Sequence, residues 1–124
     1  DIDRDMARAR SGDFGGEELS PLTYLGYRVG KTNGLRPNAR QNRLRVCFTI
    51  EMPSALPAKY RRWGRPATYQ RYASIFNHLV MLASQRRGRS NYEYAVFDWE
   101  SDAKWMQAEF GQFARDLKKF GFRR

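Results

Sequence analysis

Residues 72–83 of the chain read YASIFNHLVMLA, and this stretch decides the fold. Apolar side chains recur in it at intervals of three and four residues, which is the period of one face of an α-helix. The pattern predicts a helix over residues 67–86, with Arg71 outside the apolar face. That face comprises Tyr72, Ile75, Phe76, Leu79, Leu82 and Ala83.

A longer pattern with the same period follows over residues 91–120. Gly111 weakens a helix by about 1 kcal/mol but need not end it, so the pattern predicts one long helix or two in line. We expect Ser90 or Asn91 to cap its start. Its apolar stripe would pack against helix 67–86 in an antiparallel hairpin with an Arg-rich turn at the tip. The stripe comprises Ala95, Trp99, Ala103, Met106, Phe110, Phe113, Leu117 and Phe120.

Weaker signals precede this hairpin. Ser20 followed by Pro21 is a typical helix start and Gly26 a typical end, so we expect a short helix between them. Residues 26–35 are rich in turn signals, and their glycines would also let backbone amides approach a phosphate. The stretch matches neither the phosphate-loop nor the dinucleotide-binding motif.

Residues 37–50 have two interpretations. Pro37 can open a helix, but residues 44–50 also alternate with the period of a strand. We favour the helix because the polar residues 38–43 have no strand character. The proline-containing residues 52–66 should then form an irregular connector.

These patterns together predict a mostly α-helical domain of about four helices that ends in the antiparallel hairpin, with a strand over residues 44–50 as the alternative. The chain has 124 residues, the usual size of one domain. We expect residues 1–18 to be a flexible, acidic and glycine-rich arm, and residues 19–124 to be a single basic helical domain.

The cysteine and histidine content excludes several classes of protein. A single Cys cannot form an internal disulfide, and one Cys with one His cannot build a zinc cluster, so we expect neither a metal nor a cofactor. Cys47 lies in an apolar run and is interpreted as an inert buried thiol. No apolar run approaches the roughly 20 residues of a membrane span, and the first residues lack the apolar stretch of a signal peptide. We therefore expect no membrane partner and an intracellular location, in the cytoplasm, nucleoid or nucleus.

The formal net charge of +10 is concentrated in the middle of the chain. Residues 21–90 hold fourteen Lys and Arg against one acid, Glu51, whereas residues 1–20 carry a net charge of −3. Of the 23 basic residues 18 are Arg, whose guanidinium forms bidentate contacts with phosphate and stacks on bases. Residues 21–90, here called the central basic zone, therefore predict a surface that binds a polyanion, with nucleic acid as the favoured ligand.

We expect this zone and one aromatic residue to contact the nucleic acid. Trp63 lies between basic residues on a proline-bounded loop. There it either stacks on an exposed nucleobase or anchors the loop to the core. Arg36, Arg40 and Arg43 would share one face if residues 37–50 are helical. The predicted contacts are Arg28, Lys31, Arg36, Arg40, Arg43, Arg61, Arg62, Trp63, Arg65, Arg71, Arg86, Arg87 and Arg89.

Because of four further side chains, an enzyme that acts on nucleic acid remains an alternative. Asp98, Glu100 and Asp102 would either hold a divalent ion for nuclease chemistry or form a solvated face near a helix N-terminus. His78 is either a general base or a packing residue. We favour the solvated face and the packing role, and therefore expect no catalysis.

The sequence thus favours a non-catalytic nucleic-acid-binding domain that contacts the phosphate backbone, with duplex DNA preferred over RNA. A dedicated single-strand binder would expose several aromatic side chains, whereas most here fall on the expected core stripes. The first alternative is a basic protein-interaction or structural module, which would dock an acidic partner, a parent chain or a ribonucleoprotein. The second alternative is the nuclease-type enzyme.

Overall fold

The computed structural model describes the backbone of residues 19–119 and the side chains of residues 19–112. The predicted mostly α-helical fold is confirmed, since no strand occurs between residues 19 and 119. The predicted arm, residues 1–18, lies outside the described residues, as do the side chains of Phe113, Leu117 and Phe120. The elements are α2 (Pro21–Tyr24), α3 (Pro37–Thr49), the 3₁₀ helix η1 (Ala58–Trp63), α4 (Tyr69–Arg86), the 3₁₀ turn η2 (Ser90–Tyr92) and α5 (Glu93–Lys119).

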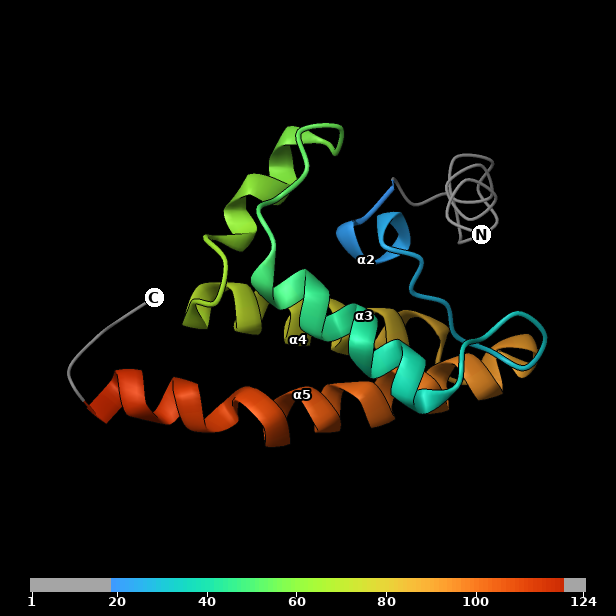
Figure 1. The fold of residues 1–124 in the computed structure, drawn as a ribbon. Helices are drawn as coiled ribbons and strands as arrows, with labels where there is room; N and C mark the ends of the chain where they lie inside the picture. Colours follow the sequence, from blue (N-terminus) through green and yellow to red (C-terminus); the bar gives the residue numbers. More distant parts are fainter. Residues whose placement is uncertain (1–18, 120–124) are drawn as a thin grey trace.

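Helices α4 and α5 form the predicted antiparallel hairpin, and α3 packs against both of them (Figure 1). Ile75 and Leu79 from α4 and Met106 from α5 are completely buried in the core. Helix α5 continues through Gly111 as one helix, which excludes two helices in line. Because η2 precedes it, α5 begins at Glu93 rather than beside the predicted caps.

Residues 37–49 are helical, as favoured from the sequence, and the alternative strand over 44–50 is excluded. The burial pattern agrees with the helical period. Cys47 is 1% exposed, whereas Arg45 and Thr49 lie on the surface. A strand would have placed these three side chains on one face, so only a helix separates them in this way.

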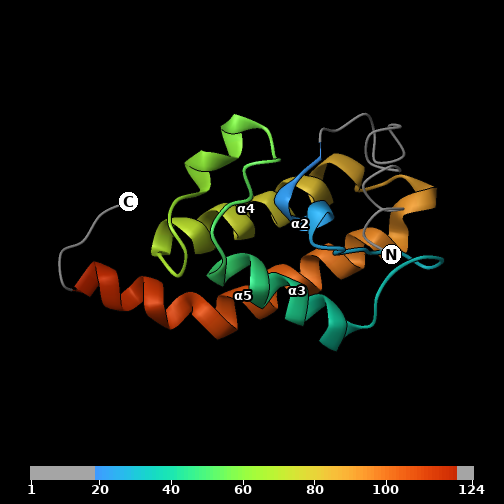
Figure 2. The same cartoon turned by 45° about the horizontal axis from the view of Figure 1, so that its top comes forward.

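The connector expected over 52–66 is irregular except for η1, which stands over the first part of α4 (Figure 2). Tyr60 and Trp63 of η1 point inward and are 8% and 9% exposed. Gly64 ends η1 with a φ of +85°, a conformation that glycine adopts without strain. The basic side chains of the connector therefore project from a short, anchored helix.

Within the part of the chain that the structure describes, no helix is both long enough and apolar enough to cross a membrane.

Candidate nucleic-acid interface

The thirteen predicted contact residues fall into three groups by exposure. Seven lie on the surface: Lys31, Arg36, Arg61, Arg62, Arg65, Arg87 and Arg89. Arg28 and Arg43 are half-buried. The other four, Arg40, Trp63, Arg71 and Arg86, are buried inside the fold, so the structure does not present them to a polyanion.

Arg40 is 4% exposed and belongs to an ion pair between α3 and α5. Its Nε donates a hydrogen bond of 2.7 Å to Oδ2 of Asp102, which is 1% exposed and also accepts a 2.6 Å bond from the Tyr27 hydroxyl. Its Nη1 donates to the carbonyl of Leu35 at 2.7 Å. Arg36, Arg40 and Arg43 therefore do not form the predicted shared basic face, because Arg40 points into the core.

The same network positions the turn-rich stretch 26–35. Asp98 accepts a 3.0 Å hydrogen bond from the amide of Gly30 and lies 3.7 Å from Nη1 of Arg40. The Gly30 amide is therefore occupied by a carboxylate of α5. A backbone–phosphate contact at this amide, which the glycines left open, would have to displace that carboxylate.

Arg71 has no exposed surface and binds carbonyl groups rather than an acid. Its Nη1 donates to the carbonyls of Cys47 and Ile50 at 2.7 and 2.8 Å, at the C-terminal end of α3. Its Nε and Nη2 donate to the carbonyl of Gly64 at 3.2 and 2.6 Å. The last carbonyls of a helix lack partners within the helix, so a buried guanidinium there satisfies them and joins α3 to the end of η1.

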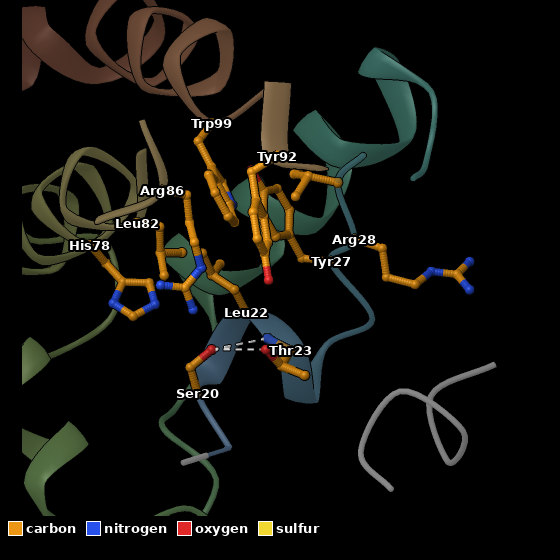
Figure 3. A pocket seen from close by; sticks show the side chains of 11 residues that line it. Ser20, Leu22, Thr23, Tyr27, Arg28, His78, Leu82, Arg86, Tyr92 and Trp99 are labelled. Atoms are coloured by element: carbon orange, nitrogen blue, oxygen red, sulfur yellow. Dashed lines mark hydrogen bonds between the residues drawn. The ribbon is translucent and has the colours of Figure 1, made fainter. Parts of the chain in front are cut away.

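Arg86 is 8% exposed and lies 5.2 Å from the centroid of the Tyr92 ring. It lines a pocket of about 40 Å³ together with His78, Trp99 and the hydroxyl groups of Ser20 and Thr23 (Figure 3). Small-molecule sites usually hold about 300 Å³ or more, so this space fits water and not a nucleotide. We therefore place the candidate interface elsewhere.

One group of exposed predicted contacts lies on residues 59–65, here called the basic segment. Arg61 and Arg62 on η1 and Arg65 just after it are exposed, and Lys59, which the predicted contacts omitted, is exposed beside them. The only acid in the connecting residues on either side is Glu51. Four cations thus occupy seven consecutive residues.

The aromatic residues of the basic segment anchor it. The Trp63 ring makes edge contacts with Tyr60, at 5.5 Å between centroids, and with His78 on α4, at 5.3 Å. Of the two roles considered for Trp63, the structure therefore shows the anchor and not an exposed stacking ring.

Two contacts from the start of α4 hold the other side of the basic segment. The Gln70 amide donates a 2.6 Å hydrogen bond to the carbonyl of Arg62, and Arg71 binds Gly64 as described above. A Cβ at Gly64 would lie 2.9 Å from the Gln70 side chain, so the close approach also requires glycine. The backbone of the basic segment is consequently fixed while its charged side chains point outward.

A second group of exposed basic side chains lies at the opposite end of α4. Arg87 and Arg89 follow the last residue of α4, whereas the basic segment precedes its first. An α-helix of 18 residues spans about 27 Å, so the two groups do not form one compact site. Lys31 belongs to this second group, because its Nζ lies 5.5 Å above the ring of Tyr94 near the start of α5.

The side chains considered for catalysis have structural partners. Asp98 and Asp102 belong to the buried network with Arg40, and Glu100 pairs with Arg87 on the surface. Among the described residues no three His, Cys, Asp or Glu side chains gather as metal ligands would. Burial, together with the nearby Lys59, lowers the pKa of His78 to about 4, so its imidazole is neutral near pH 7.

Burial also fixes the protonation of Cys47 and Tyr27. It raises the pKa of the Cys47 thiol to about 12, which agrees with the inert buried thiol expected from the sequence. It raises the pKa of Tyr27 well above its usual value, and the neighbouring Asp102 carboxylate raises it further. Tyr27 therefore remains a neutral hydrogen-bond donor to Asp102.

Two exposed aromatic residues, Tyr94 and Phe97, were absent from the predicted contacts. Both lie outside the apolar stripe of residues 91–120, and this spacing was the available signal that they face solvent.

Comparisons of the chain with protein-family models, with curated proteins and with solved structures found no match.

Proposed function

We propose that this chain is a non-catalytic nucleic-acid-binding domain whose basic segment contacts the phosphate backbone. The observation that carries the proposal is the arrangement of Lys59, Arg61, Arg62 and Arg65, three exposed cations on an anchored 3₁₀ helix and a fourth just after it. Their backbone is held by buried aromatic rings and by Gln70 and Arg71. A cationic surface held in place in this way loses less backbone entropy on binding than a flexible tail would.

The type and number of these cations suit phosphate. Arg presents a planar fork of donors that matches two phosphate oxygens, and three of the four cations are Arg. Neutralising four phosphates of duplex DNA would release their counterions and give a log–log salt slope of about −3.6. DNA is the first ligand to examine, as the sequence suggested.

A comparison of polyanions tests this proposal. The whole chain is titrated against labelled duplex DNA, single-stranded DNA and duplex RNA over a series of salt concentrations, with heparin as the control. We expect micromolar or tighter binding to nucleic acid, a steep salt slope and a preference over heparin. Absent binding at low salt, or equal binding to every polyanion, would contradict the proposal and favour the alternative of a basic module that docks an acidic protein.

A further inference from the structure

Two large aromatic side chains are exposed near the start of α5. Tyr94 is 58% exposed and Phe97 is 67% exposed. Residues three apart on a helix lie on the same face, with Cβ atoms roughly 5–6 Å apart. The two rings, here called the aromatic platform, therefore form one exposed surface and take no part in the core.

Cations lie near both ends of the aromatic platform. The Nζ of Lys31 lies 5.5 Å from the centroid of the Tyr94 ring. Beyond Phe97 along α5, Arg87 pairs with Glu100, which follows Phe97 by about one helical turn. Exposed aromatic rings flanked by cations have the composition of a site for a nucleotide, whose base stacks while its phosphate pairs.

The acids near the aromatic platform are largely occupied. Asp98 accepts a hydrogen bond from the Gly30 amide and lies near Arg40, and Glu100 pairs with Arg87. Glu93, the first residue of α5, is exposed and is the remaining acid of this turn. With Arg87 counted against Glu100, the exposed cations Lys31 and Arg89 outnumber Glu93.

We propose that the aromatic platform stacks on unpaired bases of a nucleic-acid strand, while Lys31 and Arg87 contact the adjoining phosphates. This inference rests on the proposed function and adds a second contact area to it. It also removes the sequence-based reason for preferring duplex DNA, because that reason assumed that few aromatic residues are exposed. Bases paired and stacked in a duplex do not offer a free face, so the aromatic platform selects single-stranded segments.

The test compares two single strands of equal length, one of oligothymidylate and one with abasic sites throughout. Both carry the same phosphates, and only the first carries bases. We expect the whole chain to bind the oligothymidylate more tightly. Phe97→Ala should weaken that binding by about 5- to 150-fold, as expected for one stacked base, and leave abasic binding unchanged.

Three control variants separate stacking from other effects. Phe97→Leu keeps an apolar side chain without a ring and should lose affinity nearly as Phe97→Ala does, whereas Tyr94→Phe keeps the ring and should bind as the native chain does. Met81→Ala removes an apolar side chain that is 41% exposed on α4 and should have no effect.

Each contrary result has a distinct meaning. Equal affinity for the two strands, with no effect of Phe97→Ala, overturns the aromatic platform and leaves the phosphate contacts of the proposed function standing. Absence of binding to either strand and to duplex DNA at low salt overturns both. A dimer in solution that Phe97→Ala dissociates, with base preference unchanged, shows that a second copy of the chain covers this face instead.

Discussion

Arg40 in α3 and Asp102 in α5 form a buried ion pair, with 2.7 Å between Nε of the guanidinium and Oδ2 of the carboxylate. Tyr27 donates to the same oxygen, so three segments distant in sequence meet at one carboxylate. Burial raises the pKa of Asp102, while the hydrogen bonds from Arg40 and Tyr27 act in the opposite direction. A carboxylate buried in this way is stable only while its partners remain in place.

Loss of one partner from this pair should destabilise the domain strongly. Asp102→Asn keeps the shape of the side chain but leaves the buried Arg40 guanidinium with only the more distant Asp98 as a counter-charge, at 3.7 Å, which should lower the free energy of unfolding by up to about 3–5 kcal/mol. Urea denaturation measures the loss. In a double-mutant cycle with Arg40→Met, the double variant should lose less than the two single variants added together. Additive losses would mean that the two side chains do not depend on each other.

Arg71 should not be replaceable by Lys. Its guanidinium reaches three carbonyl groups in different directions, whereas an ammonium group cannot reproduce that planar fork. Arg71→Lys should lower the free energy of unfolding by about 2 kcal/mol or more, because buried carbonyls lose their donors. Arg61→Lys, at an exposed position, is the control and should change stability by less than about 0.5 kcal/mol. Similar losses in both variants would contradict the role assigned to Arg71.

Gly64 and Gly88 allow a test of how closely the basic segment approaches α4. Both have a positive φ, +85° and +87°, but only at Gly64 would an added Cβ meet a neighbour, the Gln70 side chain. Replacement by Ala should cost about 1 kcal/mol of backbone strain at Gly88 and clearly more at Gly64, where the ψ of −177° lies in a region that essentially only glycine adopts and the Cβ would also meet Gln70. Thermal denaturation of the two variants measures the difference. An equal loss would show that the segment can move away from Gln70 freely.

The neutral imidazole of His78 should make stability depend on pH. Its folded-state pKa is about 4, whereas an unfolded His titrates near about 6.5. Between these values the unfolded state binds a proton that the folded state does not, so stability falls as the pH falls, by at most about 1.4 kcal/mol per unit.

His78→Gln isolates this effect, because it removes the titrating group. On going from about pH 6.5 to pH 5, the native chain should lose up to about 2 kcal/mol of stability relative to the variant. Denaturant unfolding at several pH values measures the difference. A difference that stays constant over this range would show that the imidazole is accessible to protons in the folded state.

Helices α4 and α5 were predictable from the sequence because apolar periodicity defines them. The core positions Ile75, Leu79 and Ala83 of α4 and Trp99, Ala103 and Met106 of α5 all lay on the expected stripes. The alternation over residues 44–50 suggested a strand as an alternative, but the polar residues before it already favoured the helix that the structure shows. The local pattern therefore determined most of the fold.

The buried charges were harder to predict, because Arg and Asp are usually exposed. Their spacing nevertheless carried a signal. Arg71 lies four residues before Ile75, and Asp102 lies three residues after Trp99, so both occupy core-facing positions once charge is disregarded. The partners of these side chains come from distant segments, and no local pattern shows which carbonyl or carboxylate will receive them.

The most direct test of the central claim is the salt dependence of duplex DNA binding by the native chain and by the Arg61→Ala/Arg62→Ala variant. If both guanidinium groups contact phosphates, the variant should bind more weakly and its log–log salt slope should be flatter by about 1.8. Lys104→Ala, which removes an exposed charge on α5, should leave the slope unchanged. A slope that does not change when Arg61 and Arg62 are replaced, or that flattens equally with Lys104→Ala, would contradict the assignment of phosphate binding to the basic segment.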